Sequence, residues 1–233
     1  MPSAARKLER PCSVYQRLRD LIIRGRLAPG VRVVEQDVAE RLGVSRTPAR
    51  EAIHRLFQDG FLIPTGIARR TELVVAPLTH DDMWDLYLVM ASLEGRAALA
   101  IGDLDGAARR DLARTLKATQ ARFEKASRER KVDYDQMFEL HNQFHDTFVR
   151  ACRRPRIVAL IDGVRQQVDR YEWVYAPLVG PDHGETFREH ADIIAVVRSG
   201  SAKGVQRAVE ANWEGGARRL ARVIGSMGAR GDW

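Results

Sequence analysis

Two histidines lie at a spacing that would let their imidazoles bind one metal ion together. His141 and His145 are four residues apart in a segment of helical periodicity, so they share one face of the expected helix. Phe138 and Phe148 lie on that same face, which therefore points toward the protein interior. Two imidazoles at this spacing can bind one divalent ion, and a third from another helix would complete a facial set of nitrogen ligands.

Two further polar residues interrupt apolar helix faces later in the chain. His190 follows Phe187 by three positions, and Asn212 follows Val209 by three, so both side chains are expected to face the core. A buried polar group without a partner costs about 1–3 kcal/mol, so each of them must be paired. Two interpretations stay open. The four polar side chains share a metal ion, or each is hydrogen-bonded inside the core, as single buried histidines usually are.

A second candidate site lies in the segment 35–62, where two short helices flank a turn at 42–45. Gly43 suits the turn, and Ser45 is expected to be the N-cap of the second helix. The apolar face of that helix is expected to consist of Ala52, Ile53, Leu56 and Phe57.

The opposite face of this second helix carries Thr47, Arg50 and His54, which are spaced three and four residues apart. Arginine can bind guanine through two hydrogen bonds, and hydroxyl groups can bind phosphates, so this face is typical of a reader of the DNA major groove. The alternative is an αα-hairpin whose charged residues only face water.

The flanking segments favour DNA binding. A helix is expected at 14–23, and two strands at 61–63 and 73–75. The hairpin formed by these strands is a plausible wing, with Arg69 and Arg70 near its tip as phosphate contacts.

The pattern LAPGxxxxExxxAxxLGVSRTPxREAIxxLxxxGF, which covers 27–61, resembles the winged helix-turn-helix of GntR-type bacterial transcription regulators. The resemblance implies DNA contacts by four residues of the FadR branch pattern, namely Ser45, Arg46, Thr47 and Arg50, and another near Gly66 at the wing tip. Gln36 stands where that branch often carries an arginine, so it is a further candidate DNA contact.

The segments FxLHNQFHDTFVRAC and FREHADIIAVVRSGSAKGVQRAVEANW resemble the effector-binding helical domain (FCD) of the same branch, in its six-helix VanR-like version. The resemblance implies one divalent metal ion, zinc or nickel, beside a pocket for a small organic acid. The implied ligand positions are His141, His145, His190 and Asn212. Two of the four differ from the usual pattern, because an aspartate usually stands at 141 and a histidine at 212.

The fold class expected is mainly α, with an N-terminal winged helix-turn-helix and a C-terminal antiparallel all-α bundle. The bundle helices are expected at 81–101, 105–129, 132–152, 156–175, 185–199 and 201–224. The expected domains are a flexible arm at 1–11, a DNA-binding domain at 12–76, a linker at 77–80, an effector-binding and dimerisation domain at 81–225, and a tail at 226–233.

Charge and composition agree with this division. The net charge is +7, and residues 1–75 contain 14 Lys/Arg and 8 Asp/Glu, whereas residues 76–233 contain 24 and 23. The positive charge is therefore concentrated where DNA is expected to bind. Cys12 and Cys152 do not make a disulfide framework, and no run of about 18 apolar residues exists, so we expect a cytoplasmic protein without a membrane segment.

The sequence predicts a ligand-responsive DNA-binding transcription regulator and not an enzyme. We expect a homodimer on double-stranded operator DNA, because two-fold symmetry matches two half-sites, and release by a small organic acid, which is the commoner mode in the resembled family. One alternative is a metal-dependent helical hydrolase, which is disfavoured because no Asp or Glu is expected on the same inward faces as a general base. Another is a constitutive DNA-binding protein with an inert dimerisation bundle, which the inward polar side chains disfavour.

Overall fold

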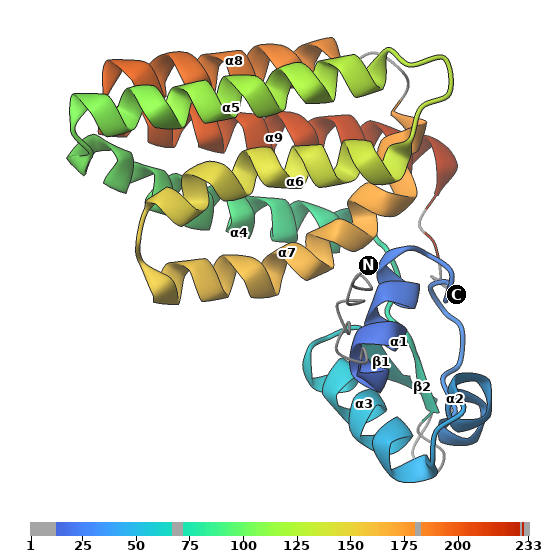
Figure 1. Cartoon of the computed structure of the whole chain (residues 1–233). Helices are drawn as coiled ribbons and strands as arrows, with labels where there is room; N and C mark the ends of the chain where they lie inside the picture. The colour runs from blue at the N-terminus through green and yellow to red at the C-terminus, as the bar shows by residue number, and fades with distance from the viewer. Residues whose placement is uncertain (1–12, 67–71, 180–182, 229, 231–233) are drawn as a thin grey trace, which may run out of the picture. The chain divides into compact units, whose positions relative to one another are not determined.

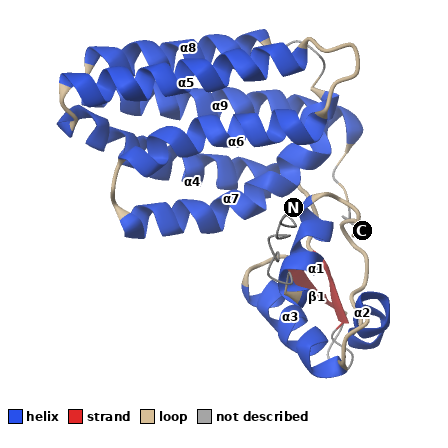
Figure 2. Cartoon of the chain, in the orientation of Figure 1, coloured by secondary structure: helices blue, strands red, loops and turns tan. Residues whose placement is uncertain are grey.

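The computed structural model describes residues 13–66, 72–179, 183–228 and 230, and its contacts divide the chain after Pro77 into two compact units. Almost all regular structure in both units is helical, apart from one two-stranded sheet (Figures 1 and 2). The mainly helical class is therefore confirmed. The arm expected at 1–11 and the wing-tip residues Arg69 and Arg70 lie outside the described residues.

The first unit contains three helices followed by a β-hairpin. The elements are α1 (Val14–Ile23), α2 (Glu35–Leu42), α3 (Arg46–Gln58), β1 (Leu62–Thr65) and β2 (Glu72–Val75). The strands pair antiparallel, from Leu62 opposite Val75 to Thr65 opposite Glu72. This order of helices and strands is the winged helix-turn-helix that the sequence predicts.

Local chemistry sets the ends of the first helices. Ser13 and Gln16 form a reciprocal capping box that starts α1. Gly43 ends α2 in the left-handed region, at a φ of 64°, where an L side chain would be strained.

One residue of the expected apolar face of α3 lies elsewhere. The buried residues of this helix are Ala49, Ala52, Ile53 and Leu56, which are spaced at intervals of three and four. Phe57 is 43% exposed, because it lies one residue and therefore about 100° beyond Leu56 around the helix. The prediction that Phe57 belongs to the buried stripe was wrong.

The second unit is a helical bundle. Its elements are α4 (His80–Ala98), the 3₁₀ turn η1 (Leu99–Asp103), α5 (Gly106–Ser127), α6 (Tyr134–Ala151), α7 (Pro155–Tyr175), the 3₁₀ turn η2 (Ala176–Leu178), α8 (Gly184–Ser199) and α9 (Ala202–Met227). Helix α4 packs along α9 and α7, while α5 packs against α6 and α8 (Figure 1). The core between them is rich in aromatic side chains such as Phe144, Phe148, Tyr171 and Tyr175.

Two helix ends differ from the sequence-based expectation. The first bundle helix changes to 3₁₀ geometry after Ala98 instead of continuing to 101. The last helix runs to Met227 and ends at Gly228, which has a positive φ of 79°. Its last turn therefore includes residues that the sequence assigned to the tail.

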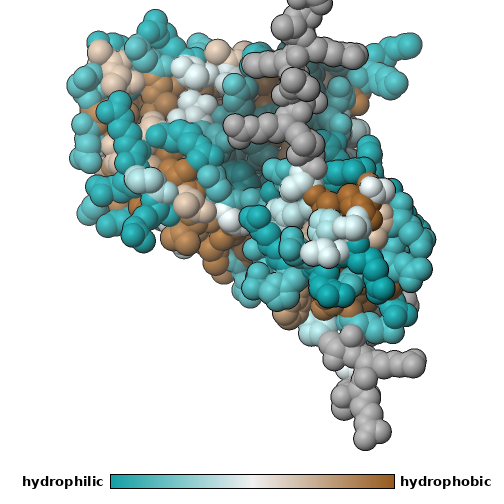
Figure 3. Space-filling view, turned by 60° about the horizontal axis from the view of Figure 1, so that its bottom comes forward, coloured by the Kyte–Doolittle hydropathy of each residue, from teal (hydrophilic) through white to brown (hydrophobic). Residues whose placement is uncertain are grey.

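The face shown in Figure 3 is mostly hydrophilic, with hydrophobic residues in separate patches. No helix among the described residues is long and apolar enough to cross a membrane.

Candidate functional site

The three histidines predicted to act together do meet inside the bundle. His141 and His145 come from α6 and His190 from α8, and one ligand nitrogen of each lies within 4.8 Å of the others. His145 and His190 are 1% and 0% exposed, respectively. The Nε2 atoms of both are buried and have no hydrogen-bond partner among the described residues.

Each imidazole is held through its other nitrogen. The Nδ1 atom of His145 lies 2.7 Å from a carboxylate oxygen of Glu94, and that of His190 lies 2.7 Å from the amide oxygen of Gln120. The Nδ1 atom of His141 is 3.4 Å from Glu172. Because each Nδ1 faces an acceptor, Nδ1 carries the ring proton and Nε2 keeps a lone pair that can bind a metal ion. Metal-bound histidines usually have this arrangement, with Nδ1 hydrogen-bonded to an acceptor.

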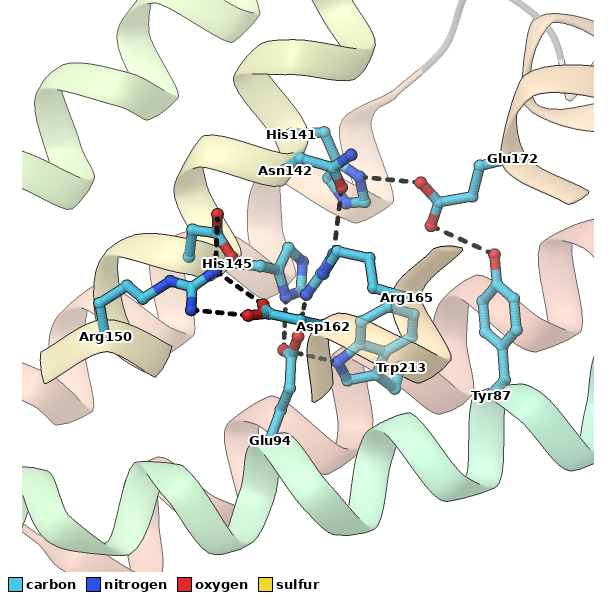
Figure 4. Close-up of polar contacts among 11 residues, drawn as sticks. Tyr87, Glu94, His141, Asn142, His145, Arg150, Asp162, Arg165, Glu172 and Trp213 are labelled. Atoms are coloured by element: carbon cyan, nitrogen blue, oxygen red, sulfur yellow. Dashed lines mark hydrogen bonds and ion pairs between the residues drawn. The ribbon is translucent and has the colours of Figure 1, made fainter. Parts of the chain in front are cut away.

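Glu94 connects the imidazole cluster to three other helices. Besides His145 it accepts a hydrogen bond of 2.8 Å from the indole Nε1 of Trp213, and it forms an ion pair with Arg165 (Figure 4). Arg165 also donates to the side-chain oxygen of Asn142 at 3.0 Å. Burial tends to raise the pKa of Glu94, but Arg165 and His145 outweigh that effect and hold the pKa below its usual value.

Burial keeps two of the imidazoles neutral. It lowers the pKa of His145, against the opposing effect of Glu94. It lowers the pKa of His190 well below the usual value, with a further contribution from His141. A neutral imidazole is the form that binds a metal ion, so the environment favours the ligand state of both residues.

The second buried carboxylate of this cluster is Glu172. It accepts a hydrogen bond of 3.3 Å from the hydroxyl of Tyr87 and faces His141 (Figure 4). Burial tends to raise the pKa of Glu172, but His141 and Arg165 hold it below its usual value.

The sequence reasoning missed these carboxylates, and its expectation that no acidic residue shares the inward faces was wrong. Glu94 is 0% exposed and lies four residues after Met90 and four before Ala98, both of which are buried. An acidic residue within an apolar face was therefore a readable signal of the same kind as the histidines. Glu172 follows the buried Val168 by four residues in the same way.

Asn212 lies in the wall of the same pocket but is held by another partner. Its amide nitrogen donates to Glu189 at 2.9 Å, and Glu189 also forms a two-pronged ion pair with Arg219, with both distances 2.8 Å. The converging donor set therefore consists of three imidazoles. Three imidazole nitrogens, two of them buried without a partner among the described residues, fit one divalent metal ion.

A pocket opens beside the imidazoles. It encloses about 870 Å³, counting the part open to solvent, and its wall includes His141, His145, Glu172, Asn212 and Arg219.

The predicted DNA-contact residues lie on the surface of the first unit. Gln36, Ser45, Arg46, Thr47, Arg50, His54 and Gly66 are all exposed. Ser45 is the N-cap of α3, yet its side chain makes no capping hydrogen bond, so its hydroxyl is available to a phosphate.

Two of these residues have acidic partners on α2. Arg50 places Nε and Nη2 at 2.9 and 3.1 Å from the two carboxylate oxygens of Glu35. Gln36 donates to Glu40 at 3.0 Å.

Comparison with known proteins identifies the family of both units. Residues 12–64 match the gntR family of bacterial regulatory proteins, and residues 85–215 match the FCD domain. The chain belongs to the GntR family of transcription regulators, in its FCD branch. It is a DNA-binding transcription regulator.

Named relatives carry the same designation. The chain is 31% identical to an HTH-type transcriptional regulator of the TAR-I ttuE-ttuC' intergenic region of Agrobacterium vitis, over 61% of this chain and 80% of the relative. It is 25% identical to the regulator YdhC of Bacillus subtilis, over 94% of this chain and 96% of YdhC.

Solved structures show the same fold. The Escherichia coli protein McbR/YncC superposes with a TM-score of 0.67 at 21% identity, covering 90% of this chain and 95% of that one. A GntR-type regulator from Rhodococcus superposes with a TM-score of 0.65 at 23% identity, covering 89% and 95%. In this GntR-family chain, α3 lies within the segment that matches the gntR family, and the histidine cluster lies within the FCD domain.

Proposed function

We propose that this regulator binds one divalent metal ion, zinc or nickel, through His141, His145 and His190, and that a small organic acid binding beside the ion changes its affinity for operator DNA. The observation that carries the proposal is the pair of buried Nε2 atoms without a partner, on His145 and His190. An unpaired buried nitrogen is costly, and a shared metal ion would satisfy both at once. When bound, the ion would supply a Lewis-acidic centre for a carboxylate.

The charges around the cluster favour an anionic ligand. The three imidazole ligands are uncharged donors, so they leave the double positive charge of the ion largely uncompensated. Glu94 is already paired with Arg165, and Glu172 is hydrogen-bonded to Tyr87 and faces His141. A carboxylate that reaches the ion would therefore meet a net positive site.

At the other unit, we propose that Ser45, Arg46, Thr47, Arg50 and His54 contact the operator from the start and outward face of α3. Gln36, Gly66, Arg69 and Arg70 would add contacts from α2 and the wing. Two copies of the chain would bind two half-sites as a homodimer. Release of a repressor by the acid is the mode we propose, with the residues 77–80 joining the two units.

The hydrolase alternative is not supported. A general base must have a free lone pair within reach of the reacting water, whereas Glu94 and Glu172 direct their oxygens to His145, Trp213, Arg165 and Tyr87. The inert-bundle alternative leaves the pocket and the unpaired imidazole nitrogens unexplained.

Metal content is the direct test of the metal site. We expect elemental analysis of the purified full-length protein to show about one zinc or nickel ion per chain. His145→Ala and His190→Ala should reduce this to a trace, whereas Asn212→Ala should retain the ion, because the amide of Asn212 is held by Glu189. A wild-type protein that stays metal-free after incubation with zinc and with nickel would contradict the proposal.

Operator release is tested separately. We expect a gel-shift titration on the DNA upstream of the protein's own gene to show salt-dependent binding that weakens when a suitable carboxylic acid is added. His145→Ala should bind DNA normally and lose the response to the acid. If His145→Ala kept the full response to the acid, the pocket would not be the site through which the acid acts.

A further inference from the structure

Apart from the histidines, the wall of the pocket is rich in aromatic side chains. Six aromatic side chains line it: Tyr87, Phe123, Tyr134, Phe138, Trp173 and Trp213. Aliphatic and sulfur-containing side chains, among them Met137, Pro177 and Leu220, fill much of the rest. Such a wall binds a ligand through contact with ring faces and edges.

Two of these rings form a pair close to the imidazoles. Phe138 on α6 and Trp173 on α7 have ring centroids 4.7 Å apart at an angle of 44°. Phe138 precedes His141 by three residues, so it lies on the same helix face one turn away. Trp173 directly follows Glu172. A small ligand whose carboxylate points to the imidazoles would therefore bring its body to this ring pair.

Two polar side chains of the wall are already paired with Glu189. Arg219 is 11% exposed and forms a two-pronged pair with Glu189, and the amide nitrogen of Asn212 donates to the same carboxylate. A sugar acid with several hydroxyl groups would leave many of them unpaired against the aromatic wall, which costs affinity.

A second carboxylate on the ligand is disfavoured for a different reason. The wall already contains Glu172, a buried acidic residue that faces His141 and the hydroxyl of Tyr87. A dicarboxylate or tricarboxylate would place a further acidic group beside it without a free cation among the described lining residues, since Arg219 is paired.

We propose that the effector is a monocarboxylic acid with one aromatic ring, of which benzoate is the simplest probe. The carboxylate would lie at the imidazole end of the pocket and the ring against Phe138 and Trp173. This inference rests on the proposed function, because it assumes that an organic acid enters this pocket.

The test is calorimetric titration of the zinc-loaded full-length protein with benzoate, cyclohexanecarboxylate, gluconate and citrate, followed by a broader set of carboxylic acids and by benzylamine as a cationic probe. We expect benzoate to bind at least about ten-fold tighter than gluconate and citrate. It should also bind about three- to ten-fold tighter than cyclohexanecarboxylate, because the saturated ring loses the specific aromatic contacts.

Two variants locate the ring. Phe138→Leu and Trp173→Leu keep an apolar side chain and remove the aromatic face, so each should weaken benzoate binding about three- to ten-fold and leave cyclohexanecarboxylate nearly unchanged. Zinc content and melting temperature measured on the same samples show whether the pocket is intact. Leu178→Ala, which changes an exposed residue outside the pocket lining, is the matched control.

The possible failures are distinguishable. If gluconate or citrate binds tighter than benzoate, or if cyclohexanecarboxylate equals it, the aromatic class is wrong while an acid-binding pocket remains. If zinc binds but none of a broad set of carboxylic acids does, the proposed effector function fails. If benzylamine binds tighter than benzoate, the pocket selects a cation and both proposals fall.

Discussion

In each unit of the chain a Glu–Arg pair joins two helices through both side chains, and the pair in the winged unit differs in exposure from the most buried pair of the bundle. Glu35 and Arg50 join α2 to α3 in the winged unit, with side chains 31% and 67% exposed. Glu94 and Arg165 join α4 to α7 in the bundle, with side chains 0% and 9% exposed. An exposed ion pair contributes little to stability and exchanges partners easily, whereas a buried charge cannot lose its partner without a large cost.

On the proposed function, the same kind of residue pair serves two purposes. Arg50 is held near Glu35, but its exposed guanidinium is free to exchange this partner for DNA. Arg165 is committed to Glu94, and through Glu94 it holds His145 and Trp213 in place (Figure 4). The exposed pair is suited to recognition, and the buried pair to supporting a rigid ligand site.

Breaking the buried pair should have the largest effect. Glu94→Ala would leave Arg165 buried without its counter-charge and would remove the partners of His145 and Trp213, so we expect a loss of about 3–5 kcal/mol in the free energy of unfolding. Chemical denaturation of the metal-free protein measures it. The double variant Glu94→Gln/Arg165→Met should recover part of the loss, because no unpaired charge remains. A loss below about 1 kcal/mol would show that the bundle does not depend on this pair.

Removing the exposed arginine should act on DNA binding and not on folding. For Arg50→Ala we expect operator affinity to fall about ten- to hundred-fold, the range of one two-pronged arginine contact to a base. The melting temperature should stay within about a degree, because the pair is exposed. Fluorescence anisotropy measures affinity for operator DNA and for a scrambled sequence. Comparing the two separates loss of base recognition from loss of a positive charge.

A matched control lies on the same helix. Arg55→Ala removes an equal charge from α3 at a position that faces the ring of Tyr15, 4.1 Å from its centroid, and not the outward face of Thr47. It should weaken binding to both DNAs about equally. If Arg50→Ala lowered the affinity for operator and for scrambled DNA equally, Arg50 would contact phosphates and not bases.

Replacing the exposed Glu35 should have a smaller effect, which lowers sequence discrimination but raises affinity for non-specific DNA. Glu35 binds the Nε side of the guanidinium of Arg50, which leaves the end formed by Nη1 and Nη2 directed away and able to bind guanine. Glu35→Gln would loosen this orientation and remove a negative charge. We expect the ratio of operator to scrambled-DNA affinity to fall about three- to five-fold, while binding to scrambled DNA becomes tighter. An unchanged ratio with tighter binding to both would show that Glu35 only repels DNA.

In both units the sequence predicted the helices better than the contacts between them. Helix positions followed from apolar periodicity, as for α6, expected at 132–152 and found at Tyr134–Ala151. The convergence of the histidines followed from polar residues within apolar faces, and Glu94 carried the same signal without being noticed. Its partners His145, Arg165 and Trp213 lie 51, 71 and 119 residues away, so their pairing depends on helix packing that periodicity does not encode. The error at Phe57 concerned which side of the helix faces the core. An apolar stripe of only four residues does not fix where the buried face is centred.

The smallest effect concerns a third acidic residue that faces the buried pair from α7. Asp169 has one carboxylate oxygen buried without a partner among the described residues, and burial together with Glu172 raises its pKa to about 7. In the unfolded chain this carboxyl group has its ordinary pKa of 3.8, so its ionisation lowers the stability of the folded state progressively as pH rises from about 4 to about 7. Asp169→Asn resembles the protonated form and should raise the melting temperature by a few degrees at pH 8, on the order of 1 kcal/mol, and by less at pH 5. Thermal unfolding of both proteins across this range measures the difference. A gain that is the same at pH 5 and pH 8 would mean that Asp169 does not titrate in the folded protein, and the charge balance around Arg165 would then have to include a third carboxylate.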